Sequence, residues 1–188
     1  MKGYTMFKRV AASLLALVLL STPTNASEKP FFSEESGDWK VVGTSSTGKK
    51  NAACGAHFYF RDGSAFAIYS DLIDGELYVV LHNVVWVIND VPGETGSVRL
   101  NFHKGEAFAS GGTALYSLID KNTIALPNLN YEKFLGAFAV NDSLVLIMPG
   151  TVPNAKIPLA GSGGATKLLA QCIKAGGKQA PPKKLIDM

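Results

Sequence analysis

The sequence predicts a mainly β fold, an antiparallel β-sandwich or open barrel of about eight short strands with one inserted short helix and a C-terminal helix. Short apolar or alternating segments recur along the chain, and turn residues such as Asp62-Gly63 separate them. Apolar residues adopt the helical spacing only after Asn130. These observations predict a single β-rich domain over residues 38–175, with a helix packed against the sheet.

The strands are expected in the following order. The first is Trp39–Val42. An Asp-Gly turn then predicts a hairpin between Cys54–Phe60 and Ala65–Ser70. The aliphatic run Glu76–Val87 predicts either one long strand or two strands bent around Asn83. Further strands are expected at 97–102, 106–109, 113–119, 123–126, 143–148 and 156–159.

Two segments have helical patterns. In Asn130–Val140 the apolar residues recur at helical spacing, and Asn130 is a good N-cap. Ser162–Ala175 predicts the closing helix, which ends at Gly176-Gly177 because glycine favours helix C-termini.

Residues 1–26 are typical of a cleaved secretory signal peptide. Lys2, Lys8 and Arg9 precede the apolar run Val10–Leu20, which is too short to cross a bilayer, and cleavage is expected after Ala26. Residues 27–37 are expected to form a lead-in segment, and residues 176–188 a disordered basic tail. We expect a periplasmic or secreted protein with no membrane span after signal cleavage.

The net charge of +3 comes from the first 26 residues, because residues 27–188 hold equal numbers of basic and acidic side chains. No basic stripe crosses the predicted domain, so the sequence does not favour a nucleic-acid partner.

Cys54 and Cys172 are the two cysteines of the chain. In an oxidising compartment they are expected to form an intramolecular disulfide bond. The alternatives are two free thiols or an intermolecular bridge.

Ser162, Gly163 and Gly164 precede the last predicted helix. Ser162 is expected to cap that helix, and the glycines could instead form an anion nest at exposed amide groups. His57, His82 and His103 lack the spacing of metal ligands, so no metal site and no cofactor is predicted. No catalytic residue is assigned, although a triad that uses Ser162 or a histidine stays open.

Tyr59, Tyr78 and Trp86 are candidates for a binding surface. Tyr59 lies in an aromatic strand whose side chains alternate between two faces, and an unbroken strand would place Tyr78 and Trp86 on one face. The alternative is that these rings are buried against a helix or loop.

The string PLAGSGGATKLLAQC, from Pro158 to Cys172, combines with Gly37-Asp38-Trp39 and Cys54 into a pattern that resembles the invasion-associated locus B family. The resemblance implies a periplasmic or surface β-domain linked to host-cell colonisation, and it transfers no catalytic residue. The chain departs from the pattern expected of the family because it can form only one disulfide bond.

Taken together, these patterns predict an exported, non-enzymatic protein-binding domain that acts in the bacterial envelope or towards a host cell. The partner is a protein of unknown identity. Two alternatives stay open, a secreted effector whose basic tail engages a host protein, and a small periplasmic hydrolase.

Overall fold

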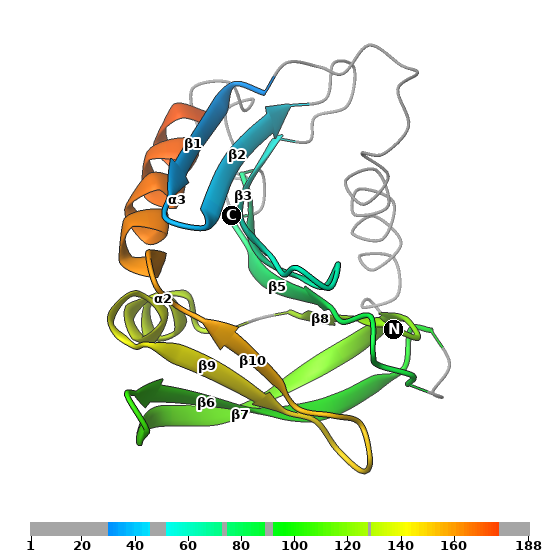
Figure 1. Cartoon of the computed structure of the whole chain (residues 1–188). Helices are drawn as coiled ribbons and strands as arrows, with labels where there is room; N and C mark the ends of the chain where they lie inside the picture. The colour runs from blue at the N-terminus through cyan, green and yellow to red at the C-terminus, as the bar shows by residue number, and fades with distance from the viewer. Residues whose placement is uncertain (1–29, 46–51, 73–74, 89–91, 128, 177–188) are drawn as a thin grey trace, which may run out of the picture.

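The computed structural model describes residues 30–45, 52–72, 75–88, 92–127 and 129–176 (Figure 1). The predicted signal peptide and residues 177–188 of the predicted tail lie outside the described residues. The described part contains ten strands and two helices. In chain order they are β1 (Phe32–Ser36), β2 (Trp39–Ser45), β3 (Ala52–Tyr59), β4 (Ala65–Asp71), β5 (Leu77–His82), β6 (Thr95–Lys104), β7 (Ala107–Asp120), β8 (Thr123–Leu126), α2 (Tyr131–Val140), β9 (Ser143–Ile147), β10 (Ala155–Pro158) and α3 (Ser162–Gly176).

All ten strands belong to one antiparallel sheet, in the order β1-β2-β3-β4-β5-β8-β7-β6-β9-β10. The predicted mainly β, open-barrel class with a C-terminal helix is therefore confirmed. The Asp62-Gly63 hairpin also forms as predicted. Gly63 adopts a φ of 91°, and the Asp62 carboxylate accepts a hydrogen bond from the Ser64 amide at 2.8 Å.

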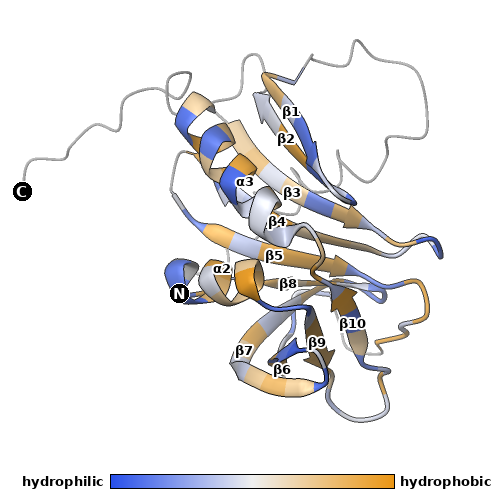
Figure 2. Cartoon of the chain, turned by 60° about the vertical axis from the view of Figure 1, so that its left-hand side comes forward, coloured by the Kyte–Doolittle hydropathy of each residue, from blue (hydrophilic) through white to orange (hydrophobic). Residues whose placement is uncertain are grey.

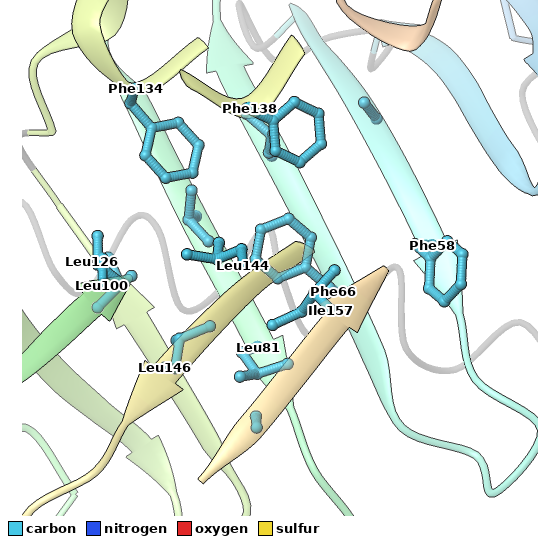
Figure 3. Close-up of a cluster of buried hydrophobic side chains, with 14 of the residues drawn as sticks. Phe58, Phe66, Leu81, Leu100, Leu126, Phe134, Phe138, Leu144, Leu146 and Ile157 are labelled. Atoms are coloured by element: carbon cyan, nitrogen blue, oxygen red, sulfur yellow. The ribbon is translucent and has the colours of Figure 1, made fainter. Parts of the chain in front are cut away.

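The sheet curls so that strands from its two halves enclose a common core. Phe66 of β4, Leu144 of β9 and Ile157 of β10 are all fully buried in one cluster (Figure 3). Two tryptophan indoles join the halves. Trp39 donates to the Ala160 carbonyl at 3.0 Å, and Trp86 donates to the Pro153 carbonyl at 2.8 Å. Both N–H groups thus keep a partner inside the core, as buried tryptophan requires.

The two helices close the open side of the curl. Asn130 caps α2 as predicted, because its side chain accepts a hydrogen bond from the Lys133 amide at 3.0 Å. Helix α3 packs against β1, β2 and β3 and contacts α2 (Figures 1 and 2). A disulfide bond between Cys54 and Cys172 holds α3 on β3, which confirms the predicted pairing. No helix among the described residues is long and apolar enough to cross a membrane.

Three predictions about the strands need correction. The first strand is β1 (Phe32–Ser36), within the expected lead-in segment, because the turn at Gly37 (φ 59°) folds it back onto β2. The run Glu76–Val87 contains one short strand, β5 (Leu77–His82), rather than one long strand or two strands bent around Asn83. The expected strands 106–109 and 113–119 are one strand, β7, which continues through Gly111-Gly112 opposite β6.

Candidate functional site

The register of β3, β4 and β5 gathers aromatic side chains on one side of the sheet. Gly55 pairs with Tyr69, and Tyr69 pairs with Tyr78. His57 and Tyr59 follow Gly55 at every second residue of β3, so they lie on the same face. We call His57, Tyr59, Tyr69 and Tyr78 the tyrosine face. Cys54 alternates with these residues, so the tyrosine face points away from α3.

The rings of the tyrosine face contact one another in a row. His57 stacks on Tyr59 with ring centroids 6.0 Å apart and an angle of 4° between the planes. The His57 centroid lies 5.2 Å from that of Tyr69, which it meets edge-on, and Tyr69 lies 6.2 Å from Tyr78. Small residues make room for the row, since a Cβ on Gly55 would lie 2.6 Å from His57 Nε2 and 2.9 Å from Tyr69 Cε1.

Exposure and charge differ along this row. Tyr59 is 61% exposed, Tyr69 and Tyr78 are half-buried, and His57 is buried. Burial, together with the positive charge of Lys40 on the neighbouring strand, lowers the pKa of His57 to about 4, so its imidazole is neutral at pH 7. Burial also raises the pKa values of Tyr59 and Tyr69. The face therefore presents neutral aromatic rings with polar edges.

Trp86 is not part of this surface, and its prediction as a surface residue is wrong. The chain turns after β5, where the Trp86 amide donates to the Asn83 carbonyl at 3.0 Å. The turn directs the indole inward, and its exposed fraction is 0%. Tyr59 and Tyr78 do share one face. Sequence reasoning placed neither His57 nor Tyr69 beside them. Two-residue alternation along β3 could have placed His57 on this face, and the Asp62-Gly63 hairpin could have placed Tyr69 opposite β3.

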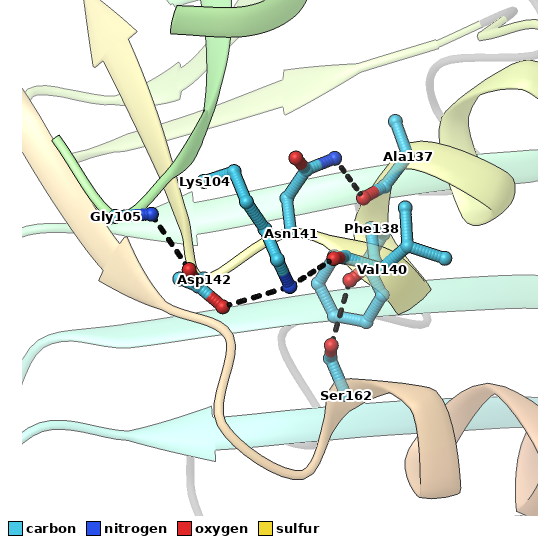
Figure 4. Close-up of polar contacts among 8 residues, drawn as sticks. All are labelled: Lys104, Gly105, Ala137, Phe138, Val140, Asn141, Asp142 and Ser162. Atoms are coloured by element: carbon cyan, nitrogen blue, oxygen red, sulfur yellow. Dashed lines mark hydrogen bonds and ion pairs between the residues drawn. The ribbon is translucent and has the colours of Figure 1, made fainter. Parts of the chain in front are cut away.

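Ser162 lies at a junction of helix ends (Figure 4). Its hydroxyl is buried and donates to the Phe138 carbonyl of α2 at 2.6 Å, rather than capping α3. Neighbouring carbonyls of α2 accept hydrogen bonds from the side chains of Asn141, at the Ala137 carbonyl, and Lys104, at the Val140 carbonyl. These bonds satisfy groups that a helix C-terminus leaves open. The bond of Ser162 gives no support to its use as a hydrolytic nucleophile.

Gly163 and Gly164, the predicted anion nest, lie in the first turn of α3 close to neighbouring elements. A Cβ on Gly163 would lie 3.0 Å from the Ala139 carbonyl oxygen, and one on Gly164 would collide with the Ser36 hydroxyl. These glycines therefore allow α3 to approach α2 and β1. The lack of a side chain at these two positions serves packing, and an anion nest at their amides stays a prediction.

The histidines have separate surroundings. His82 Nδ1 lies 2.9 Å from the Thr123 hydroxyl, which donates to the Asp120 carboxylate at 3.0 Å. Since the hydroxyl proton goes to Asp120, Nδ1 of His82 is the donor in its bond with Thr123. His103 contacts Phe108 edge-on. Within the described residues, no group of three His, Cys, Asp or Glu side chains could hold a metal ion.

Comparison with solved structures gives a distant structural neighbour. No family model matches the chain, and no curated protein matches it. The crystal structure of invasion associated protein B from Bartonella henselae aligns with a TM-score of 0.46 and 16% sequence identity, over 76% of this chain and 99% of that chain. The chain thus bears a distant structural resemblance to that protein.

Proposed function

We propose that this chain is an exported, non-enzymatic protein-binding domain that acts in the bacterial envelope or towards a host cell. The tyrosine face is the observation that carries the proposal. Tyr59 presents a large ring at 61% exposure next to the half-buried rings of Tyr69 and Tyr78. Tyrosine is enriched where proteins bind proteins, because its ring offers apolar area and its hydroxyl offers a hydrogen bond.

The position of these rings on strands supports binding rather than chance exposure. Strands β3, β4 and β5 are paired on both sides, so the backbone beneath the rings is held in place. Tyr59 is further restrained by its stack on His57. Ordering side chains before a partner arrives lowers the entropic cost of association. A protein partner with apolar or aromatic side chains at its contact surface suits this face.

Export to the periplasm or beyond is part of the same proposal. The signal-peptide pattern of residues 1–26 supports it, and so does the disulfide bond between Cys54 and Cys172, since such bonds persist in oxidising compartments.

The test is affinity capture with the oxidised chain from Ser27 to Met188, in envelope extract and host-cell lysate in parallel, read by mass spectrometry. Tyr59→Ala and Val85→Ala form a pair matched in exposure, because both side chains are 61% exposed. We expect a saturable partner that is lost with Tyr59→Ala and retained with Val85→Ala, confirmed by titration with the purified partner.

Two results would contradict the proposal. A partner retained by Tyr59→Ala would show that binding uses another surface. No saturable partner from either source, with a folded and oxidised chain, would remove the protein-binding function itself and lead to a screen for hydrolytic activity.

A further inference from the structure

One strand inside the sheet has an open edge. Strand β7 pairs with β6 along its length, whereas on its other side β8 pairs only with residues from Ser117 to Asp120. Within the described residues, no strand pairs with that side of Ser110–Leu115. The edge is open because β8, Thr123–Leu126, is much shorter than β7.

The backbone groups of this edge point outward at alternate residues. The Leu118 amide donates to the Glu94 carbonyl at 2.9 Å, and its carbonyl accepts from the Gly93 amide at 2.8 Å, so Leu118 directs both groups to the side of β6. Residues of an antiparallel strand alternate in this respect. Leu115, Thr113 and Gly111 therefore direct their amide and carbonyl groups to the open edge.

The open edge lacks the features that protect the two outer edges of the sheet. Glu34 and Glu35 lie on β1, and Lys156 and Pro158 lie on β10. Charges and proline on edge strands prevent pairing with further strands. Residues 107–115, AFASGGTAL, contain neither a charged residue nor a proline.

Two large apolar side chains are exposed beside this edge, Phe108 at 61% and Leu115 at 65%. Both lie on the same face of β7. A Cβ on Gly111 would lie 3.1 Å from Phe108 Cε2, so the Phe108 ring covers Gly111, and Leu115 follows Gly111 at an even spacing. A β-bulge opposite Phe102 and His103 turns Phe108 onto this face.

We propose that the open edge of β7 pairs with the same edge of a second copy of this chain, antiparallel and two-fold symmetric about Thr113. In this register Leu115 lies opposite Gly111 of the second copy. Its exposed side chain then contacts the Phe108 ring that covers that glycine, and the symmetry repeats the contact. No charged residues oppose one another in the paired segment.

The register also explains why the second copy is a better occupant than an unrelated extended segment. Any extended chain could satisfy the backbone groups, but β7 itself supplies an apolar ring opposite Leu115. Beyond Ser110, the second copy's strand would approach Ser117 of the first copy, the residue at which β7 starts to pair with β8. The β-bulge bends the second copy's strand at that point. The interface is isologous. It uses no residue of the tyrosine face and therefore goes beyond the proposed binding function.

Sedimentation velocity of the oxidised chain from Ser27 to Met188, over a range of concentrations, tests the proposal. We expect a concentration-dependent dimer whose dissociation constant rises at least tenfold with Thr113→Lys. The matched control is Ser33→Lys on the charged edge of β1, which should leave the constant unchanged. Tyr59→Ala should also leave it unchanged.

Thr113→Cys tests the register. Residues that exchange both backbone hydrogen bonds across an antiparallel pair lie about 5.5 Å apart at Cα, which suits a disulfide bond. We expect Thr113→Cys to form a covalent dimer under mild oxidation and Ser33→Cys to stay monomeric. A chain that is monomeric at every concentration would overturn the proposal, and so would a dimer that Thr113→Lys leaves intact while the variant folds normally.

Discussion

The two faces of β3, β4 and β5 come from the same residues in alternation, yet they are covered in different ways. Cys54, Phe66 and Val79 point into the core, where their exposed fractions are 0%. On the other face the exposure ranges from buried His57 to Tyr59 at 61%. Side chains of the core face are constrained by the volume that they must fill. Side chains of the tyrosine face are constrained by the order in which their rings pack over small residues. Substitutions should therefore affect stability on one face and recognition on the other.

Two residues on opposite faces of β4 provide the largest contrast. Phe66 has ring centroids 6.0 Å from Trp39 and 6.2 Å from Phe138, and its replacement by alanine leaves a cavity between them. We expect Phe66→Ala to lower the free energy of unfolding by roughly 3–5 kcal/mol. Tyr69→Ala, on the other face, should cost roughly 1 kcal/mol because its ring is only half-buried. Urea denaturation measures both values.

Equal losses for these two variants would contradict the comparison. Equal losses would mean that the tyrosine face contributes as much to the free energy of unfolding as the core does. The slope of the urea transition should stay constant between the variants, because both unfold the same domain.

The disulfide bond provides the second contrast, since it anchors α3 to the core face alone. It joins residues separated by 118 positions, and Gly43 leaves room for it, because a Cβ there would lie 2.7 Å from Cys172 Sγ. We expect the double variant Cys54→Ala/Cys172→Ala to lose about 2–4 kcal/mol of unfolding free energy. Thermal denaturation with and without a reductant checks this, because reductant should destabilise the wild type and leave the double variant unchanged.

Local chemistry made much of the fold predictable from sequence. The Asp62-Gly63 turn, the Asn130 cap and the pairing of the only two cysteines each depend on residues whose effect is local or on a simple count. The strand β1 was not predictable in this way. Its Glu34 and Glu35 favour a solvent-exposed segment, and only its pairing with β2 makes it a strand.

Tertiary contacts decided the features that the sequence could not reveal. The β-branched run after His82 has strand propensity, but the turn at Asn83 and the bond of Trp86 to Pro153 override it. His57 and Tyr69 of the tyrosine face were likewise not predicted, because the set of residues on this face depends on the register between strands. The open edge of β7 depends on the relative lengths of β7 and β8 and on nothing local to either strand.

His57 sharpens the comparison through pH. Its pKa is about 4 in the folded chain, against 6.5 for the free side chain, so the folded state favours the neutral imidazole. The corresponding stability is complete above pH 6.5 and decreases as the pH falls towards 4. Linkage gives a loss of about 2 kcal/mol at pH 5. Urea denaturation at pH 7 and pH 5 should show this loss in the wild type and a smaller one in His57→Gln.

His103→Gln is the control for this measurement, because His103 lies outside the tyrosine face and contacts Phe108 instead. The loss between pH 7 and pH 5 should be the same in His103→Gln as in the wild type. A wild-type loss that His57→Gln leaves unchanged would show that other groups cause the acid sensitivity.

Tyr59 should give the smallest effect on stability and the largest effect on recognition. Its exposed ring leaves little to lose on folding, so we expect Tyr59→Ala to change the unfolding free energy by no more than about 0.5 kcal/mol. Removing the ring also admits water to the stacked His57, which should raise the pKa of His57 towards 6.5 in an NMR titration. Tyr59→Phe should keep that pKa low, because the phenyl ring still covers the imidazole. If Tyr59→Ala left the pKa of His57 near 4, the cover of the imidazole would come from Tyr69 and the strands beneath, and Tyr59 would be free to move to meet a partner.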